Sequence, residues 1–455
     1  MTKFKQNTIT YIVKKHSESS EYLRQKRTQR VLRRMSKSIR ESEEEDSPHK
    51  KSTIQVRLQR LEHFCEIIQS KLDLSKYSSE LVVQVPSNFS LYERTAETLQ
   101  LIGKIAQIKY YDDISGVIID YRRCKNNDLA AENLLADTIK AIKEYKKQNS
   151  LYFSVKGNYP QKERIKRLIR SIGVVKETAS QRYHLQGKEK DELRIFRRQS
   201  DINEESDIFG KDKKTRATED FTDHLDDCLK FIQAKLDEDE RDKLEKYLGE
   251  VLGNAEDHSG TRIWTILGYF DAFEPNKKYS EIVITSVGKT IFETFEEKKN
   301  VPIVYEDLEQ YVDRHKGKSF SKEQLCMVYS MQKNVSSKKD ESVDRGQGTW
   351  YLIDLFHHLA SECERINDIN GQGTTSSKPR MTIISGSSAL MFNEEFDPSK
   401  GGKTTGDYAF NTENDLSQPP SKNFVKRYKD IKFPGTIIYI KFPIYEQLLA
   451  AEDDN

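Results

Sequence analysis

The stretch EVLGNAEDHSG, residues 250–260, decides how the second half of this chain is interpreted. It closes a segment from Asp237 in which apolar residues recur at the spacing of a buried helical stripe. The residues of this stripe are Leu244, Tyr247, Leu248, Val251 and Leu252. Glu250, Asn254 and Asp257 lie at i, i+4 and i+7, so we expect them to form a polar line beside the stripe.

The polar line has two interpretations. As a solvated helix face it needs no further role, because 33% of the residues in the chain are charged. As a catalytic face it offers the side-chain oxygen of Asn254, a neutral hard ligand that suits Mg²⁺ bridging nucleotide phosphates. Glu250, one turn away, would then polarise an attacking water molecule, and Asp257 would support the nucleotide or the end of the helix.

Four downstream segments bear on this choice. EIVITSVGKTIFETF (281–295) reads as a strand, a tight turn and a helix, and SSKKDESVDRGQGTWYLIDLFHHLA (336–360) reads as a glycine-rich loop followed by a helix. MTIISGSSALMF (381–392) and PGTIIYIKFP (434–443) read as two final strands. These four segments follow the quoted helix in the order of the sequence motifs of the GHKL ATPases, the family of gyrase and the histidine kinases. The chain resembles that family over roughly residues 215–445.

The resemblance implies a site for ATP and Mg²⁺. Glu250 would be the catalytic base and Asn254 the Mg²⁺ ligand. The nucleotide-binding residues would be Asn254, Asp257, Ser286, Gly288, Thr290, Arg345, Gly346, Gly348, Thr349 and Thr436. Ser286 stands where the family has the Asp that binds the adenine amino group, and Thr290 replaces a glycine, so adenine specificity stays open. SVGKT also reads as a plain strand-to-helix turn with Gly288 at positive φ.

Three functions are compatible with these boxes. The first is Mg²⁺-dependent ATP binding with slow hydrolysis, in which closure of the lid drives a conformational change that regulates a partner. The second is a protein serine kinase of the anti-sigma type, which the resemblance also covers and in which the Glu is the base toward a hydroxyl. The third is a degenerate GHKL module that does not hydrolyse ATP and serves protein interaction. Several members of the family dimerise on binding ATP, so an ATP-dependent homodimer is a further expectation.

Residues 53–178 alternate between apolar strands and amphipathic helices, which predicts a partly parallel sheet. The predicted strands are 81–86, 116–121 and 151–155, and the predicted helices are 53–75, 91–108, 129–145 and 162–172. This order resembles that of STAS-like domains, the anti-sigma-antagonist fold. The loop RRCKNNDLA (122–130) has no Ser or Thr, so the resemblance implies a scaffold or a docking module for a protein partner rather than a phosphoserine switch.

The sequence therefore predicts an α/β protein in which a STAS-like α/β domain precedes a GHKL (Bergerat-type) α/β sandwich with a mixed sheet. The predicted parts are a basic and acidic N-terminal arm (1–52), the STAS-like domain (53–178), a charged linker (179–215), the ATPase-like domain (216–447) and an acidic tail (448–455). In the linker, LRIFR (193–197) can pair as an additional strand. The arm has three alternatives: a solvated segment, a contact for nucleic acid or an acidic partner, or a membrane-surface helix.

Composition narrows the class of protein. The net charge is only +2, which argues against a general attraction to nucleic acid or anionic membranes. No apolar run approaches the roughly 20 residues of a membrane-spanning helix. The five cysteines are scattered and form no C-x-x-C pair, so we expect them to be reduced. These features predict a cytoplasmic protein that is not inserted in a membrane.

Overall fold

The computed structural model describes most of the second half of the chain and much of the first. The described residues are 48–69, 79–174, 192–200, 213–232, 235–273, 278–315, 317, 319–333, 335–336, 350–354, 356–357, 379–393, 396 and 407–443. The chain divides into two compact units, residues 1–54 and 55–455. Most of the predicted N-terminal arm, part of the charged linker and the acidic tail fall outside the described residues.

A short parallel sheet organises the first part of the second unit. Its strands run in the order β1 (Glu80–Gln84), β3 (Gly116–Asp120) and β5 (Ser154–Asn158), and both pairings are parallel. A second parallel pair joins β2 (Asn88–Phe89) to β4 (Asn126–Asn127). The partly parallel sheet predicted from the alternation of strands and helices is therefore confirmed.

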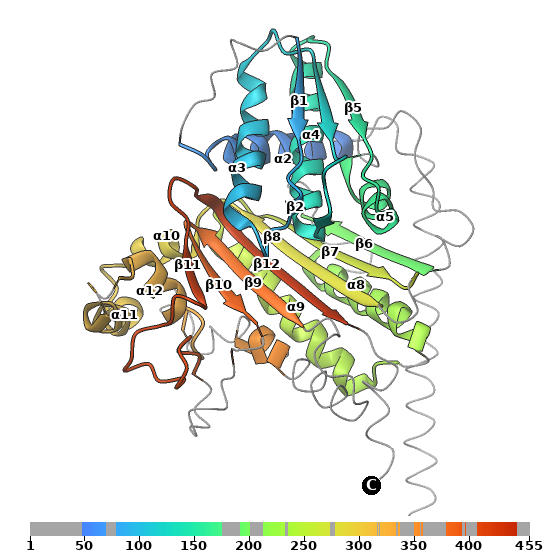
Figure 1. The fold of residues 1–455 in the computed structure, drawn as a ribbon. Helices are drawn as coiled ribbons and strands as arrows, with labels where there is room; N and C mark the ends of the chain where they lie inside the picture. The colour runs from blue at the N-terminus through green and yellow to red at the C-terminus, as the bar shows by residue number, and fades with distance from the viewer. Residues whose placement is uncertain are drawn as a thin grey trace, which may run out of the picture. The chain divides into compact units, whose positions relative to one another are not determined.

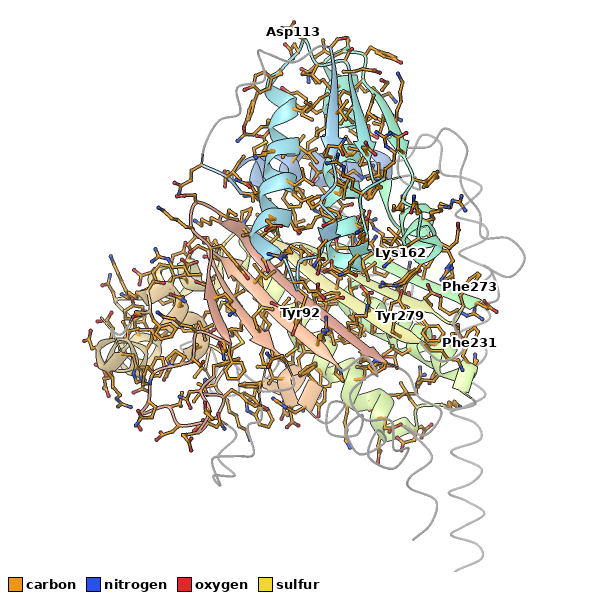
Figure 2. All side chains as sticks on the ribbon, viewed as in Figure 1. Tyr92, Asp113, Lys162, Phe231, Phe273 and Tyr279 are labelled. Carbon is orange, nitrogen blue, oxygen red and sulfur yellow. The ribbon has the colours of Figure 1, made fainter. Side chains whose placement is uncertain are left out.

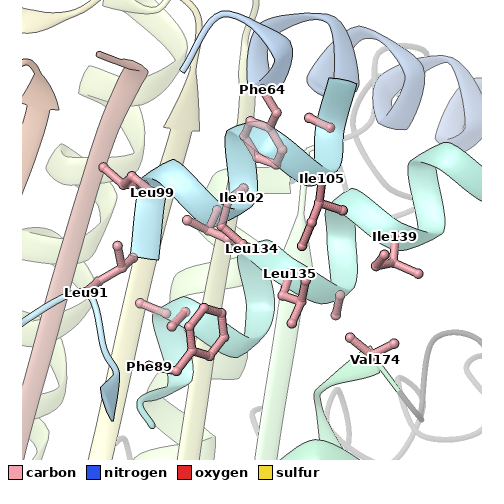
Figure 3. Close-up of a cluster of buried hydrophobic side chains, with 14 of the residues drawn as sticks. Phe64, Phe89, Leu91, Leu99, Ile102, Ile105, Leu134, Leu135, Ile139 and Val174 are labelled. Atoms are coloured by element: carbon pink, nitrogen blue, oxygen red, sulfur yellow. The ribbon is translucent and has the colours of Figure 1, made fainter. Parts of the chain in front are cut away.

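Helices and this parallel sheet enclose an apolar core. The helical segments are α2 (Pro48–Cys65), α3 (Thr95–Ala106), η1 (Gln107–Tyr110, a 3₁₀ turn), α4 (Leu129–Gln148) and α5 (Glu163–Ser171). At the start of α4 the Asp128 carboxylate accepts a hydrogen bond from the Ala131 backbone N–H, which caps the helix. Phe64 of α2, Ile102 of α3 and Leu134 of α4 are buried and point toward one another (Figure 3). We call residues 55–69 and 79–174 the α/β module.

A larger sheet contains seven strands in the order β11–β10–β9–β12–β8–β7–β6 (Figure 1). These strands are β6 (Leu193–Gln199), β7 (Ile263–Asp271), β8 (Tyr279–Val287), β9 (Arg380–Gly386), β10 (Ser388–Phe392), β11 (Val425–Arg427) and β12 (Phe433–Pro443). Every pairing among these described strands is antiparallel, so the expected mixed sheet is wrong for them. Consecutive strands such as β9 and β10 pair directly through a tight turn, which only an antiparallel arrangement allows.

One of the two predicted final strands is a hairpin. Residues 381–392, expected as a single strand, belong to β9 and β10, which fold back on each other at Ser387. Gly386 permits this turn, because its φ of 63° lies in the left-handed region that glycine adopts without strain. The additional strand predicted at LRIFR is confirmed as β6, which pairs with β7 at one edge of the sheet.

The large sheet separates two hydrophobic cores. The helices that pack with it are α8 (Lys213–Leu229), α9 (Glu238–His258), α10 (Ile291–Glu296), α11 (Pro302–His315) and α12 (Lys322–Tyr329), with the 3₁₀ turn η2 (Lys230–Ile232) after α8. On β8, Val283 packs with the α/β module, whereas Ile284 packs with the helices. On β12, Ile437 packs with the α/β module and Ile438 packs with the helices. Among the helices that the structure describes, none has the length and apolarity needed to cross a membrane.

Buried ion pairs join the α/β module to the large sheet. Arg60 of α2 and Arg197 of β6 donate hydrogen bonds of 2.8 and 2.6 Å to the carboxylate of Asp137 on α4. Arg167 of α5 donates a 3.0 Å hydrogen bond to Asp271 of β7. The Arg197–Asp137 and Arg167–Asp271 pairs cross from the module to the sheet, and loss of either partner would be costly because it leaves a buried charge unpaired.

The cysteines that the structure describes are free thiols. Cys65, Cys124, Cys228 and Cys326 are buried, whereas Cys363 lies outside the described residues. Burial raises the pKa of Cys65 to about 11 and that of Cys124 to about 12. Both thiols therefore stay protonated, and weakly reactive, at neutral pH.

Candidate functional site

A pocket lies on the helix-covered face of the large sheet, between α9, α10 and strands β8 and β12. It also includes the chain that follows α12. The lining residues are Val251, Asn254, Ala255, His258, Ser259, Ile284, Ser286, Lys289, Ile291, Thr294, Phe295, Ser330, Met331, Val335, Ser336, Thr436 and Ile438. Of the residues predicted to bind nucleotide, the structure thus brings Asn254, Ser286 and Thr436 together in one pocket.

Helix α9 positions Asn254 as the sequence predicts. The helix begins at a capping box, in which Asp237 accepts from the Glu240 backbone N–H and Glu240 accepts from that of Asp237. The buried stripe includes Leu248 and Val251, so it turns one face of the helix into the core. Asn254 is half-buried beside this stripe and reaches the pocket.

Two other predicted residues of α9 do not line the pocket. Glu250, the predicted catalytic base, is exposed one turn before Asn254. Asp257 is also exposed, near the C-terminal end of the helix. A catalytic role for Glu250 would therefore require that the bound ligand extend from the pocket past Asn254.

The floor of the pocket is formed by adjacent residues of β8 and β12. Ser286 lies opposite Thr436, and Ile284 lies opposite Ile438. Directly opposed side chains in an antiparallel pair have Cβ atoms about 5 Å apart. The floor thus consists of one row of two hydroxyls beside one row of two isoleucines.

The turn after β8 is shaped by its contact with the end of α9. Gly288 has a φ of 132°, and a Cβ atom there would lie 2.1 Å from the Ser259 carbonyl oxygen. The Lys289 backbone N–H donates to the same oxygen at 2.8 Å. The interpretation of SVGKT as a strand-to-helix turn with Gly288 at positive φ is thereby confirmed.

Thr290 has a local structural role. Its hydroxyl caps α10 by accepting from the Glu293 backbone N–H at 3.2 Å, and the Glu293 side chain accepts from the Thr290 backbone N–H at 2.8 Å. Neither Gly288 nor Thr290 is among the pocket-lining residues. Thr294 and Phe295 of the same short helix line the pocket instead.

The charge of the lining suits an anionic ligand. Its residues include no Asp or Glu among those the structure describes, and its ionisable side chains are those of Lys289 and His258. The Lys289 ammonium lies 2.7 Å from the carboxylate of Glu297, and both side chains are largely exposed. An exposed pair of this kind is weak, so a more highly charged ligand can compete for the lysine.

The lid residues predicted to contact phosphate, Arg345, Gly346, Gly348 and Thr349, lie outside the described residues. Both flanks of that segment are described. Ser336 lines the pocket before it. After it, the ring of Tyr351 stacks on that of Tyr247 from α9, with centroids 4.6 Å apart and planes 12° apart. The chain therefore leaves from the pocket and returns to the helix that carries Asn254.

The pocket offers an oxygen ligand suited to Mg²⁺, the carboxamide of Asn254. Within the described residues no three His, Cys, Asp or Glu side chains gather to hold a metal ion. Mg²⁺ in nucleotide sites is commonly held by one or two protein oxygens, with phosphate and water oxygens completing an octahedron. The Asn254 carboxamide at the pocket fits that requirement as a single protein ligand.

Several lining residues were not predicted from the sequence. Ser330 and Met331 follow α12, in a segment where the sequence shows no motif. Phe295 could have been found from its i+4 spacing to Ile291, because both face the same side of α10. Comparisons with family models, curated proteins and solved structures found no match to this chain.

Proposed function

We propose that this chain binds ATP with Mg²⁺ in the pocket beside Asn254, as a GHKL-type ATPase, and hydrolyses it slowly. The observation that supports this most directly is that Asn254, Ser286 and Thr436, which are far apart in the sequence, line one pocket. An apolar row, neutral polar groups and a lining whose described residues include no carboxylate suit a ligand with a flat base and anionic phosphates.

The residues then have distinct tasks. Asn254 supplies a neutral oxygen ligand, and the metal ion, when bound, neutralises charge on the phosphates. Lys289 and the polar residues near the end of α9 face the anionic part of the ligand. Glu250 orients and deprotonates the attacking water on the exposed side of Asn254.

The output of the site is a change of conformation that regulates a protein partner. Segment 337–349, which resembles the GHKL lid, follows the pocket residue Ser336 in the sequence and precedes Tyr351, whose ring stacks on that of Tyr247 in α9. Ordering of such a segment by a terminal phosphate and its release after hydrolysis is a known switching device. The α/β module, with its STAS-like order of elements, provides the docking surface for the partner.

A second candidate function is a module that binds nucleotide, or only protein, without hydrolysis. It is favoured by the position of Glu250, which is exposed and outside the pocket lining. A module that binds nucleotide shares the pocket and differs from the ATPase in releasing no phosphate, whereas a module that binds only protein shows no thermal shift with ATP.

The test is the thermal unfolding midpoint with ATP, with and without Mg²⁺. A ligand at one hundred times its dissociation constant stabilises a protein by about 2.7 kcal/mol. We expect a Mg²⁺-dependent rise that is lost in Asn254→Ala and kept in the control Asn423→Ala, which changes an exposed residue outside the pocket. The absence of any rise at millimolar ATP would contradict the proposal.

A further inference from the structure

The two hydroxyls on the pocket floor differ in their hydrogen bonding. Ser286 is only 7% exposed, and within the described part of the chain its hydroxyl forms no hydrogen bond. This hydroxyl is therefore able to donate to a ligand or to accept from one.

The hydroxyl of Thr436, in contrast, donates its only hydrogen to the neighbouring Ser385. The Ser385 hydroxyl accepts from the Ile291 backbone N–H at 3.0 Å and donates to the Gly435 carbonyl at 2.8 Å. With its only proton used, Ser385 meets Thr436 Oγ1 at 3.2 Å as an acceptor, so Thr436 is the donor. The Thr436 oxygen keeps only lone pairs for a ligand, and it is a fixed acceptor.

The apolar half of the floor indicates where a nucleotide base lies. Ile284 and Ile438 form the row next to the hydroxyls, and Phe295 of α10 lines the same pocket. A purine ring placed over these side chains directs one polar edge at Ser286 and Thr436. The phosphates then extend toward Asn254 and Lys289.

We infer that this floor recognises both purines and that Ser286 is the residue that leaves adenine and guanine undistinguished. The inference rests on the proposed nucleotide site. Adenine presents an amino donor and a ring-nitrogen acceptor, which pair with Thr436 and with a donating Ser286. Guanine presents a carbonyl acceptor and N–H donors, which pair with Ser286 and Thr436 respectively. Both bases are satisfied because one hydroxyl is fixed as an acceptor and the other is free to rotate.

A carboxylate at position 286 would make the pocket floor favour adenine over guanine. It can only accept hydrogen bonds, so it matches the adenine amino group and repels the guanine carbonyl. The described residues of the lining include no such carboxylate.

The experiment is calorimetric titration of the full chain with Mg²⁺-ATP and Mg²⁺-GTP. We expect the two dissociation constants of the wild type to agree within about threefold, and Ser286→Asp to favour ATP by about thirtyfold, the discrimination typical of a well-placed pair of base contacts. Thr436→Val, which removes the fixed acceptor, weakens both nucleotides. Thr285→Val is the control, because Thr285 is a buried residue of β8 on the other face of the sheet, and its hydroxyl has no partner in the described structure.

The outcomes separate the inference from the proposed function. ATP binding with GTP more than about thirtyfold weaker in the wild type overturns the inference and leaves the ATP site standing. Binding of neither nucleotide overturns both. Should Ser286→Asp unfold, Ser286→Ala takes its place: equal weakening of ATP and GTP supports the inference, and loss of ATP binding alone overturns it.

Discussion

The backbone N–H of Leu129 donates a 2.8 Å hydrogen bond to Glu281 Oε2. Leu129 is the first residue of α4, so the Glu281 carboxylate lies at the positive end of a 20-residue helix. Glu281 is fully buried on β8, where Tyr439 and Lys441 of β12 donate to it at 3.1 Å each. The two strands that form the pocket floor on one face thus hold the α/β module on the other.

Arg164 of α5 completes this junction. Its guanidinium lies 3.3 Å from Glu281 and 4.6 Å from the ring centre of Tyr279, which is labelled in Figure 2. Burial by itself raises the pKa of a carboxyl, but Lys441, Arg164 and the Leu129 N–H together hold the pKa of Glu281 below its usual value. The carboxylate is therefore charged in the folded protein at neutral pH.

The first prediction concerns removal of that charge. Glu281→Ala leaves Lys441 and Arg164 without their shared partner, and a broken buried ion pair costs about 3–5 kcal/mol. We expect a loss of this size in the free energy of unfolding measured with urea. Glu413→Ala, which changes an exposed loop residue, serves as the control and should change stability by less than about 0.5 kcal/mol. Equal stabilities of the two variants would show that the junction contributes nothing to folding.

The second prediction concerns the turn between β8 and α10. In Gly288→Ala a Cβ atom would lie 2.1 Å from the Ser259 carbonyl oxygen at a φ of 132°, so the turn must move. We expect a loss of about 2 kcal/mol or more in unfolding free energy. Gly249→Ala is the matched control, because its Cβ meets no atom within 4 Å and α9 gains about 0.5–1 kcal/mol from alanine. The prediction fails if both alanines stabilise the protein.

A third prediction follows from Glu132, a buried residue of α4. Its carboxylate accepts from the Tyr121 hydroxyl at 2.8 Å and from the Asn127 amide at 3.0 Å. Burial raises its pKa from 4.5 to about 7. Between these values the folded protein holds a proton that the unfolded chain has lost. The stability this gives is complete below pH 4.5 and is lost as the pH rises through about 7.

Glu132→Gln tests this assignment. Glutamine stays neutral, so we expect the variant to be more stable than the wild type at about pH 8, by up to about 3 kcal/mol, and similar to it at about pH 5. Urea denaturation at the two pH values measures the difference. Parallel pH profiles for variant and wild type would refute the raised pKa of Glu132.

Local elements could be predicted from the sequence where one pattern dominates. The apolar spacing around Leu248 gave helix α9, and EIVITSVG gave strand β8 and the turn at Gly288. The hairpin at Gly386 was missed because MTIISGSSALMF, residues 381–392, reads as one strand when the central Ser-Gly-Ser-Ser is not taken as a turn.

Long-range relationships could not be predicted in the same way. Glu281 lies in a strand that is buried on both faces, and nothing in the local sequence indicates that its partners are Leu129, Arg164 and Lys441. The pocket shows the same limit. The family resemblance placed Ser286 and other motif residues in one site, but the residues after α12 carry no motif and reach the pocket only through tertiary packing.

The last prediction separates hydrolysis from binding. Glu250 is exposed one turn from Asn254. In the proposed complex its carboxylate would reach water beside the phosphates without touching the base. Removing a general base lowers the rate of a reaction by about 10²–10⁴-fold. We expect Glu250→Gln to reduce phosphate release by this factor while the ATP dissociation constant changes by less than about threefold, because the side chain acts on the attacking water rather than on the bound nucleotide. Glu238→Gln changes an exposed residue in the first turn of the same helix. It is the charge-matched control and should retain full activity.

Three other outcomes would change this assignment. Unchanged phosphate release in Glu250→Gln would exclude this residue as the base. No release from the wild type despite tight ATP binding would favour the non-hydrolysing module. Radiolabel from the γ-phosphate appearing on protein instead of in solution would identify a protein kinase rather than an ATPase, with the same carboxylate as the candidate base.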